Sequence, residues 1–138
     1  MKIKLFIIPL LLFATITNAE VKEINNDDII KLIEDNVPIV DIRRPAEWRD
    51  TGVIAGSNLL TFFDKKGNYD FEEWLIRFKK IAKEGDPVII ICRSGRRSSA
   101  VSKLLNEQAN YKNVYNASGG IISWINSKNE TIDLNIQN

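Results

Sequence analysis

The segment from Val88 to Gln108 constrains this chain more than any other. Residues 88–91 are four consecutive β-branched residues, a pattern typical of a strand buried on both faces, as in parallel sheets. A short loop begins at Cys92, and apolar residues at helical spacing follow it, with Ser98 or Ser99 available as the helix N-cap. The sequence therefore predicts a strand, a tight loop and a helix, with a cysteine where the strand ends.

The loop places three cations around this cysteine. Arg93, Arg96 and Arg97 all follow Cys92 closely, although positive charge near a helix N-terminus is normally unfavourable. The arrangement becomes favourable if an anion lies among the arginines, and the free N–H groups of a first helical turn attract an anion too. The pattern favours a reactive thiolate over the alternative, a buried structural cysteine with solvated arginines nearby.

The chain contains no histidine. This absence excludes Ser-His-Asp and Cys-His nucleophile systems and makes a zinc site unfavourable. Any activation of Cys92 must therefore be electrostatic, and we expect neither a metal nor a cofactor.

The first 19 residues have the pattern of a secretory signal peptide. Two lysines precede an apolar run from Leu5 to Ile16, and the small residue Ala19 closes the segment. An uncleaved membrane anchor is the alternative, but the apolar run is short for a membrane span. We expect cleavage after Ala19, export to the periplasm, and no stable membrane association of the remaining domain, residues 20–138.

The composition of residues 20–138 limits the possible partners. These residues carry 17 basic and 18 acidic side chains, so bulk attraction to nucleic acid is not predicted. Cys92 is the only cysteine, so no internal disulfide is possible. An unpaired cysteine in an exported protein indicates intermolecular pairing or a reactive thiol.

The rest of the chain alternates strand and helix patterns. This alternation predicts an α/β fold, a three-layer sandwich with a central, mostly parallel sheet flanked by helices. Ligands of such sheets bind at the carboxyl ends of the strands, where Cys92 lies. Besides the central segment, strands are expected at residues 21–24, 39–42, 52–57 and 114–115, helices at residues 26–36, 44–48, 70–82 and 121–126, and a weakly packed tail at residues 128–138.

Asp41 falls inside the apolar strand at residues 39–42. A carboxylate in such a place needs a partner, and Arg43 or Arg44 is the nearest candidate. We favour a structural ion pair over a catalytic acid, because buried carboxylates are usually paired.

Four segments of the chain resemble the rhodanese (sulfurtransferase) domain, in its small, single-domain periplasmic form. They are residues 41–48, 52–57, 92–98 and the pair Gly119-Gly120 followed by Trp124. The chain departs from the usual pattern at Val53, often histidine, and at Ala55, often proline, neither of which carries the chemistry.

The resemblance implies that Cys92 accepts a sulfane sulfur from a donor anion such as thiosulfate, forms a persulfide, and passes the sulfur to cyanide or a thiol. It implies loop amides aimed at the sulfur, and a sulfonate held by Arg93 and Arg97. Asp41 and Arg43 would be structural residues near the site. The substrate-binding residues implied are Arg93, Ser94, Gly95, Arg96 and Arg97.

Two other functions fit a cysteine in an anion-binding loop. Cysteine-based phosphatases and arsenate reductases need five residues between cysteine and arginine, whereas four separate Cys92 from Arg97. The loop is therefore one residue short of encircling a tetrahedral oxyanion. A persulfide carrier that serves a protein partner without turning over free thiosulfate requires the same cysteine and stays open.

Overall fold

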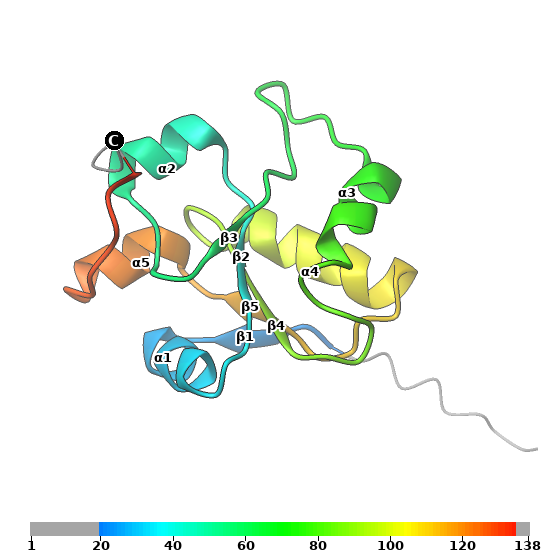
Figure 1. Ribbon diagram of the computed structural model, residues 1–138, viewed down its shortest axis with the longest axis horizontal. Coiled ribbons are helices and arrows are strands. Elements are labelled where there is room, and N and C mark those ends of the chain that lie inside the picture. The colour runs from blue at the N-terminus through cyan, green and yellow to red at the C-terminus, as the bar shows by residue number, and fades with distance from the viewer. Residues whose placement is uncertain (1–19, 135–138) are drawn as a thin grey trace, which may run out of the picture.

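The computed structural model describes residues 20–134, so the predicted signal peptide lies outside the described residues. Strands and helices alternate along this part of the chain (Figure 1). The elements in order are β1 (Lys22–Ile24), α1 (Asn26–Glu34), β2 (Ile39–Asp41), α2 (Pro45–Thr51), β3 (Asn58–Leu59), α3 (Phe71–Phe78), β4 (Val88–Ile91), α4 (Arg96–Gln108), β5 (Val114–Ala117) and α5 (Gly120–Asn126).

The strands form one sheet in the order β1-β5-β4-β2-β3, and every neighbouring pair is parallel. β4 is central, with Ile90 opposite Val40 of β2 on one side and Asn116 of β5 on the other. β1, which lies within the strand predicted at residues 21–24, is an edge strand. Because all strands run the same way, the loops that follow β2, β4 and β5 meet at one edge of the sheet.

Helices cover both faces of the sheet, which confirms the predicted α/β sandwich (Figure 1). Val88 and Ile90 face α3 and α4, whereas Ile89 and Ile91 face α1 and α5. Successive side chains of β4 point to opposite faces of the sheet, so its four residues contribute two side chains to each core. All four side chains are fully buried, as expected for a strand covered on both sides.

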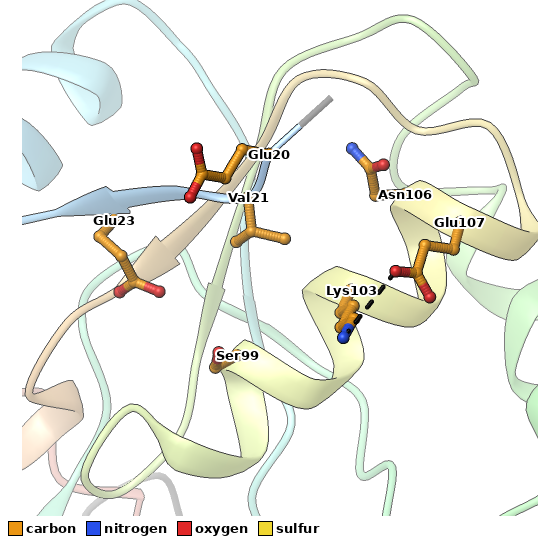
Figure 2. A pocket seen from close by; sticks show the side chains of 7 residues that line it. All are labelled: Glu20, Val21, Glu23, Ser99, Lys103, Asn106 and Glu107. Atoms are coloured by element: carbon orange, nitrogen blue, oxygen red, sulfur yellow. Dashed lines mark ion pairs between the residues drawn. The ribbon is translucent and has the colours of Figure 1, made fainter. Parts of the chain in front are cut away.

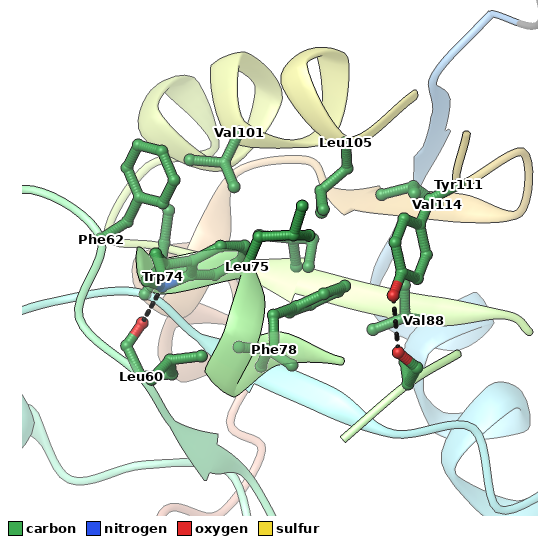
Figure 3. Packing of buried hydrophobic residues seen from close by; sticks show 14 of the residues in the cluster. Leu60, Phe62, Trp74, Leu75, Phe78, Val88, Val101, Leu105, Tyr111 and Val114 are labelled. Carbon is green, nitrogen blue, oxygen red and sulfur yellow. Dashed lines mark hydrogen bonds between the residues drawn. The ribbon is translucent and has the colours of Figure 1, made fainter. Parts of the chain in front are cut away.

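The larger core lies between the sheet, α3 and α4 and is rich in aromatic rings (Figure 3). Trp74 stacks on Phe78 at a centroid distance of 4.7 Å. The indole N–H of Trp74 donates to the carbonyl oxygen of Leu60 at 3.2 Å. The hydroxyl of Tyr111 donates to the carbonyl oxygen of Ala82 at 2.8 Å. The polar atoms of these buried rings are therefore satisfied.

The strand predicted at residues 52–57 is wrong. Gly52 and Gly56 have φ values of 74° and 78°, which turn the chain out of extended conformation, and the strand β3 begins later, at Asn58. The glycines mark the bends on either side of a loop, and Val53 forms only an isolated antiparallel bridge with Ile132.

None of residues 128–134 is buried, and Ile132 is 43% exposed, which agrees with the weakly packed tail predicted from the sequence. Two main-chain hydrogen bonds nevertheless attach this segment to the rest of the domain. The N–H of Ile132 donates to the carbonyl oxygen of Val53 at 2.7 Å, and the N–H of Val53 donates to the carbonyl oxygen of Ile132 at 3.0 Å. A Cβ at Gly52 would lie 2.7 Å from the carbonyl oxygen of Ile132, so the glycine lets the two segments approach. The tail is thus fixed by main-chain bonds, which side-chain patterns do not reveal.

α3 is shorter than predicted and ends at Phe78, after which turns carry the chain to Ala82. No helix within residues 20–134 is both long enough and apolar enough to cross a bilayer.

Candidate active site

Cys92 is the first residue after β4, and its side chain lies at the carboxyl edge of the sheet. Only 1% of the residue is exposed. Gly95 adopts a left-handed conformation with φ of 90° and caps α4, which begins at Arg96. The predicted N-cap, Ser98 or Ser99, is therefore wrong: the bend at Gly95 turns the chain into the helix earlier than a serine cap would.

The sulfur atom of Cys92 accepts three hydrogen bonds. The backbone N–H of Gly95 donates at 3.2 Å, and Ser98 donates through its backbone N–H at 3.4 Å and its hydroxyl at 3.2 Å. Donors of this kind stabilise negative charge on sulfur. Ser98 is fully buried and is a site residue that the sequence prediction missed, because the prediction used Ser98 as a cap rather than as a first-turn donor.

Further N–H groups of the loop are free. Those of Ser94, Arg96 and Arg97 have no hydrogen-bond acceptor within residues 20–134. Unpaired N–H groups are the rule in a first helical turn. Here they lie at the N-terminal end of α4, which is the end next to Cys92. Of the amides of residues 93–97, which the resemblance places around the sulfur, Gly95 is the one that donates to it within the described residues. The role of the other amides stays a prediction.

The turn between β5 and α5 supports the loop from the other side. The N–H of Ile121 donates to the carbonyl oxygen of Cys92 at 2.9 Å, and the N–H of Ile122 donates to the carbonyl oxygen of Arg93 at 3.2 Å. A Cβ at Gly120 would lie 2.5 Å from both of these carbonyl oxygens. The close approach requires glycine, and it explains why the Gly119-Gly120 pair accompanies the cysteine loop.

The three loop arginines have different surroundings. Arg97 forms a bidentate ion pair with Glu47 of α2, with nitrogen to oxygen distances of 2.6 and 3.0 Å. Arg93 and Arg96 are exposed, and their guanidinium groups have no partner within the described residues. Two of the three arginines are therefore available to an incoming anion, while the charge of Arg97 is already compensated.

Glu47 is the second site residue that sequence reasoning missed, since its partner Arg97 lies 50 positions away in the sequence. The hydrogen bonds from Arg97 lower the pKa of Glu47 from 4.5 to about 2, with further contributions from Arg44. The same hydrogen bonds raise the pKa of Arg97, with smaller contributions from Cys92 and Asp41. The pair ties α2 to the first turn of α4.

We expect Glu47→Gln to destabilise the fold by about 1 kcal/mol at pH 7, because the partly exposed ion pair is lost. A carboxyl group whose pKa is lowered by folding stabilises the protein fully when the pH is above its unfolded-state pKa of 4.5. This stabilisation is lost as the pH falls toward the folded-state pKa of about 2. Urea unfolding of wild type and variant should therefore converge as the pH falls through that window.

Glu107→Gln is the matched control, because the ion pair of Glu107 with Lys103 is largely exposed and longer, at 3.9 Å. A difference between Glu47→Gln and wild type that stays constant from pH 7 to pH 3 would contradict the assigned cause of the shift.

Asp41 and Arg43 form the buried ion pair that the sequence predicted. The distance between Asp41 Oδ2 and Arg43 Nη2 is 2.7 Å, and both side chains are almost fully buried. Arg43 also donates to Thr51 Oγ1 at 2.7 Å and to the carbonyl oxygen of Gly52 at 3.0 Å. The pair joins the end of β2 to the end of α2, and this arrangement is structural.

Within residues 20–134, no group of three or more potential metal-ligating side chains comes together. The chemistry available at this edge of the sheet is that of a buried sulfur, main-chain and hydroxyl donors, and two unpaired guanidinium groups.

A model of the rhodanese-like domain matches residues 25–127, which include every element from α1 to α5. The chain belongs to the rhodanese-like domain family. The resemblance to the rhodanese domain is thus confirmed, together with the α/β fold, whereas the periplasmic location stays a prediction.

Three similar proteins illustrate the range of this family. A mitochondrial protein of Schizosaccharomyces pombe described as a candidate thiosulfate sulfurtransferase is 31% identical over 90 residues, which cover 62% of this chain and 61% of that protein. The rhodanese-related protein of Thermoplasma volcanium is 26% identical, with 81% of this chain and 98% of that chain covered and a TM-score of 0.60. The polysulfide-sulfur transferase homodimer of Wolinella succinogenes is 20% identical, with 87% and 84% covered and a TM-score of 0.65, a likeness of fold alone.

These comparisons show a sulfurtransferase-type family. The roles of Cys92 and of the loop residues 93–97 in this rhodanese-like domain stay predictions.

Proposed function

We propose that this rhodanese-like domain is a sulfurtransferase that moves a sulfane sulfur from thiosulfate, or a similar anionic donor, to a thiophilic acceptor such as cyanide or a thiol. The proposal depends most on one observation: the sulfur of Cys92 accepts three hydrogen bonds, from Gly95 and from both donors of Ser98. Such a site stabilises a sulfur anion without histidine, which the chain lacks.

In the first half of the cycle, the thiolate of Cys92 attacks the outer sulfur of thiosulfate. A sulfur–sulfur bond forms on the cysteine, the sulfur–sulfur bond of thiosulfate breaks, and its electron pair leaves with sulfite. In the second half, cyanide attacks the outer sulfur, thiocyanate departs, and the thiolate returns. The covalent intermediate predicts ping-pong kinetics.

The same loop suits both anionic states of the cysteine. The free N–H groups of Ser94, Arg96 and Arg97 provide donors for a second sulfur atom beyond Sγ. Preorganised donors of this kind stabilise reactant and intermediate without rearranging. The exposed guanidinium groups of Arg93 and Arg96 would attract the dianionic donor, because unpaired charges attract a dianion more strongly than charges in ion pairs do.

The decisive experiment is intact mass spectrometry of the protein after incubation with thiosulfate. We expect an added mass of one sulfur atom, located on Cys92 by peptide mapping and removed by cyanide. The control is sulfite in place of thiosulfate, which carries no sulfane sulfur. A protein that stays unmodified in excess thiosulfate would refute this donor.

We expect Arg93→Ala to raise KM for thiosulfate by about three- to tenfold and to change kcat by less than about twofold, because an exposed charge acts mainly on binding. The measurement is steady-state thiosulfate:cyanide turnover. Arg77→Ala is the matched control, since Arg77 is an exposed arginine on α3. A KM equal to that of wild type would remove Arg93 from the donor site.

A persulfide carrier is the second candidate, because only 1% of Cys92 is exposed and a partner that opens the loop would suit such burial. Strong sulfur loading by mass spectrometry with negligible cyanide turnover would favour the carrier. A phosphatase is disfavoured, since Glu47 occupies the Arg97 guanidinium that would have to bind a phosphoryl group.

We further propose that residues 1–19 direct the protein to the periplasm and are removed after Ala19. N-terminal sequencing of the protein from a periplasmic fraction should begin at Glu20. A protein that retains Met1 would contradict the proposed cleavage.

A further inference from the structure

We infer that Asn116 is a positioning residue for the loop that carries Cys92, a role that rests on the proposed function. Asn116 lies on β5 and is 2% exposed. Its side-chain Nδ2 donates to the carbonyl oxygen of Gly95 at 3.2 Å and to the two carboxylate oxygens of Glu23 at 2.9 and 3.1 Å. Gly95 in turn donates its N–H to the sulfur of Cys92 at 3.2 Å. A continuous series of contacts therefore joins the edge strand β1 to the reactive sulfur.

The orientation of the Asn116 amide is determined by its neighbours. Both the carboxylate of Glu23 and the carbonyl of Gly95 are hydrogen-bond acceptors, so the NH₂ group must face them. The other end of the amide, Oδ1, is buried and has no partner within the described residues. The NH₂ group of Asn116 therefore supplies two N–H donors, one for the carboxylate of Glu23 and one for the carbonyl oxygen of Gly95.

Gly95 has no side chain, so its position depends on close backbone packing and on the hydrogen bonds to its carbonyl group. Its left-handed conformation and its lack of a side chain place bare backbone against the β5–α5 turn, where a Cβ would lie 2.9 Å from the nitrogen of Gly119. The carbonyl of Gly95 accepts from the N–H of Ser99 at 3.1 Å as well as from Asn116. With its carbonyl held twice, the glycine keeps its N–H directed at the sulfur.

Glu23 forms the outer end of this contact series. Its side chain is exposed and points from β1 toward the first turn of α4, where Ser99 lies (Figure 2). Glu23 lines two neighbouring cavities of about 430 and 510 Å³, and Asn116 lines the smaller one together with Ser94 and Arg96 of the loop. Because Glu23 is exposed, its substitution tests the contact series without creating a void in the core.

The test begins with Asn116→Leu, which keeps a similar volume and removes both donors. We expect persulfide formation from thiosulfate to slow by about tenfold, with KM changed by less than about twofold, because the arginines that attract the donor are untouched. The matched control is Asn58→Leu: Asn58 of β3 donates its Nδ2 to the carbonyl oxygen of Ile39 at 3.2 Å, away from the loop. This control should react at the wild-type rate.

Glu23→Ala separates positioning from simple structural support. This change removes the link between β1 and β5 and leaves the bond from Asn116 to the carbonyl of Gly95 in place. We expect the melting temperature to fall while persulfide formation keeps the wild-type rate within about twofold. A rate that falls as far as in Asn116→Leu would show a structural link only and would overturn the inference.

Alkylation of Cys92 by iodoacetamide makes the test independent of the sulfur donor. At a fixed pH near neutrality, we expect Asn116→Leu to react about threefold more slowly than wild type and Asn58→Leu, because the thiolate loses an oriented donor. If the wild type is not loaded by thiosulfate, the proposed function fails while alkylation still decides the role of Asn116. Equal alkylation rates in wild type and Asn116→Leu would overturn the inference.

Discussion

Replacing Cys92 with serine is expected to abolish sulfur transfer and leave the fold intact. A hydroxyl group at this position cannot form a persulfide, so thiosulfate:cyanide turnover should fall by at least about a thousandfold. The hydroxyl is close in size to the thiol and can accept from the same N–H groups of Gly95 and Ser98. The free energy of unfolding should therefore change by no more than about 1 kcal/mol.

Ser98→Ala provides the matched control for this experiment. It removes the hydroxyl that donates to Sγ at 3.2 Å but keeps the sulfur and the backbone donors, so turnover should be reduced rather than lost. Turnover by Cys92→Ser at the wild-type level would reject the covalent mechanism. Loss of the folded state in that variant, detected by circular dichroism, would contradict the expectation that the thiol is dispensable for packing.

The largest effect on stability is expected from Arg43→Met. This change leaves the carboxylate of Asp41 buried, with no exposed surface and without its guanidinium partner. Breaking a buried ion pair from one side costs about 3–5 kcal/mol. Domains of this size are stable by about 5–15 kcal/mol, so the variant should lose a large share of its stability in urea unfolding.

Two further variants make this prediction specific. Lys103→Met breaks an ion pair that is exposed at both ends and should cost no more than about 1 kcal/mol. Adding Asp41→Asn to Arg43→Met removes the uncompensated charge and should recover part of the loss. If Arg43→Met were no more destabilising than Lys103→Met, the buried pair would not hold β2 and α2 together.

Local patterns were enough to predict the architecture and the position of Cys92 at the carboxyl end of a central strand. The β-branched run of β4 and the cysteine that follows it are contiguous in the sequence, and their period and order determine a buried parallel strand that ends in a loop. The pairing of Asp41 with Arg43 was likewise predictable, because the two residues are neighbours and a carboxylate within an apolar strand needs a cation.

Several of the missed features depend on residues that are distant in sequence. Glu47 reaches Arg97 across 50 positions, and Asn116 contacts Glu23 across 93. Ser98 was misassigned as a cap because the left-handed bend that starts α4 is set by the packing of Gly95 against Gly119. The Gly52 to Ser57 segment was misread since glycines bracket loops as well as strands.

The arrangement of the sheet has a consequence for the order of folding. β1 pairs only with β5 within the described sheet, so during synthesis β1 has no neighbouring strand until Ala117 has been added. Closing so long a loop is slow, and we expect β1 to be the last strand protected from hydrogen exchange during refolding.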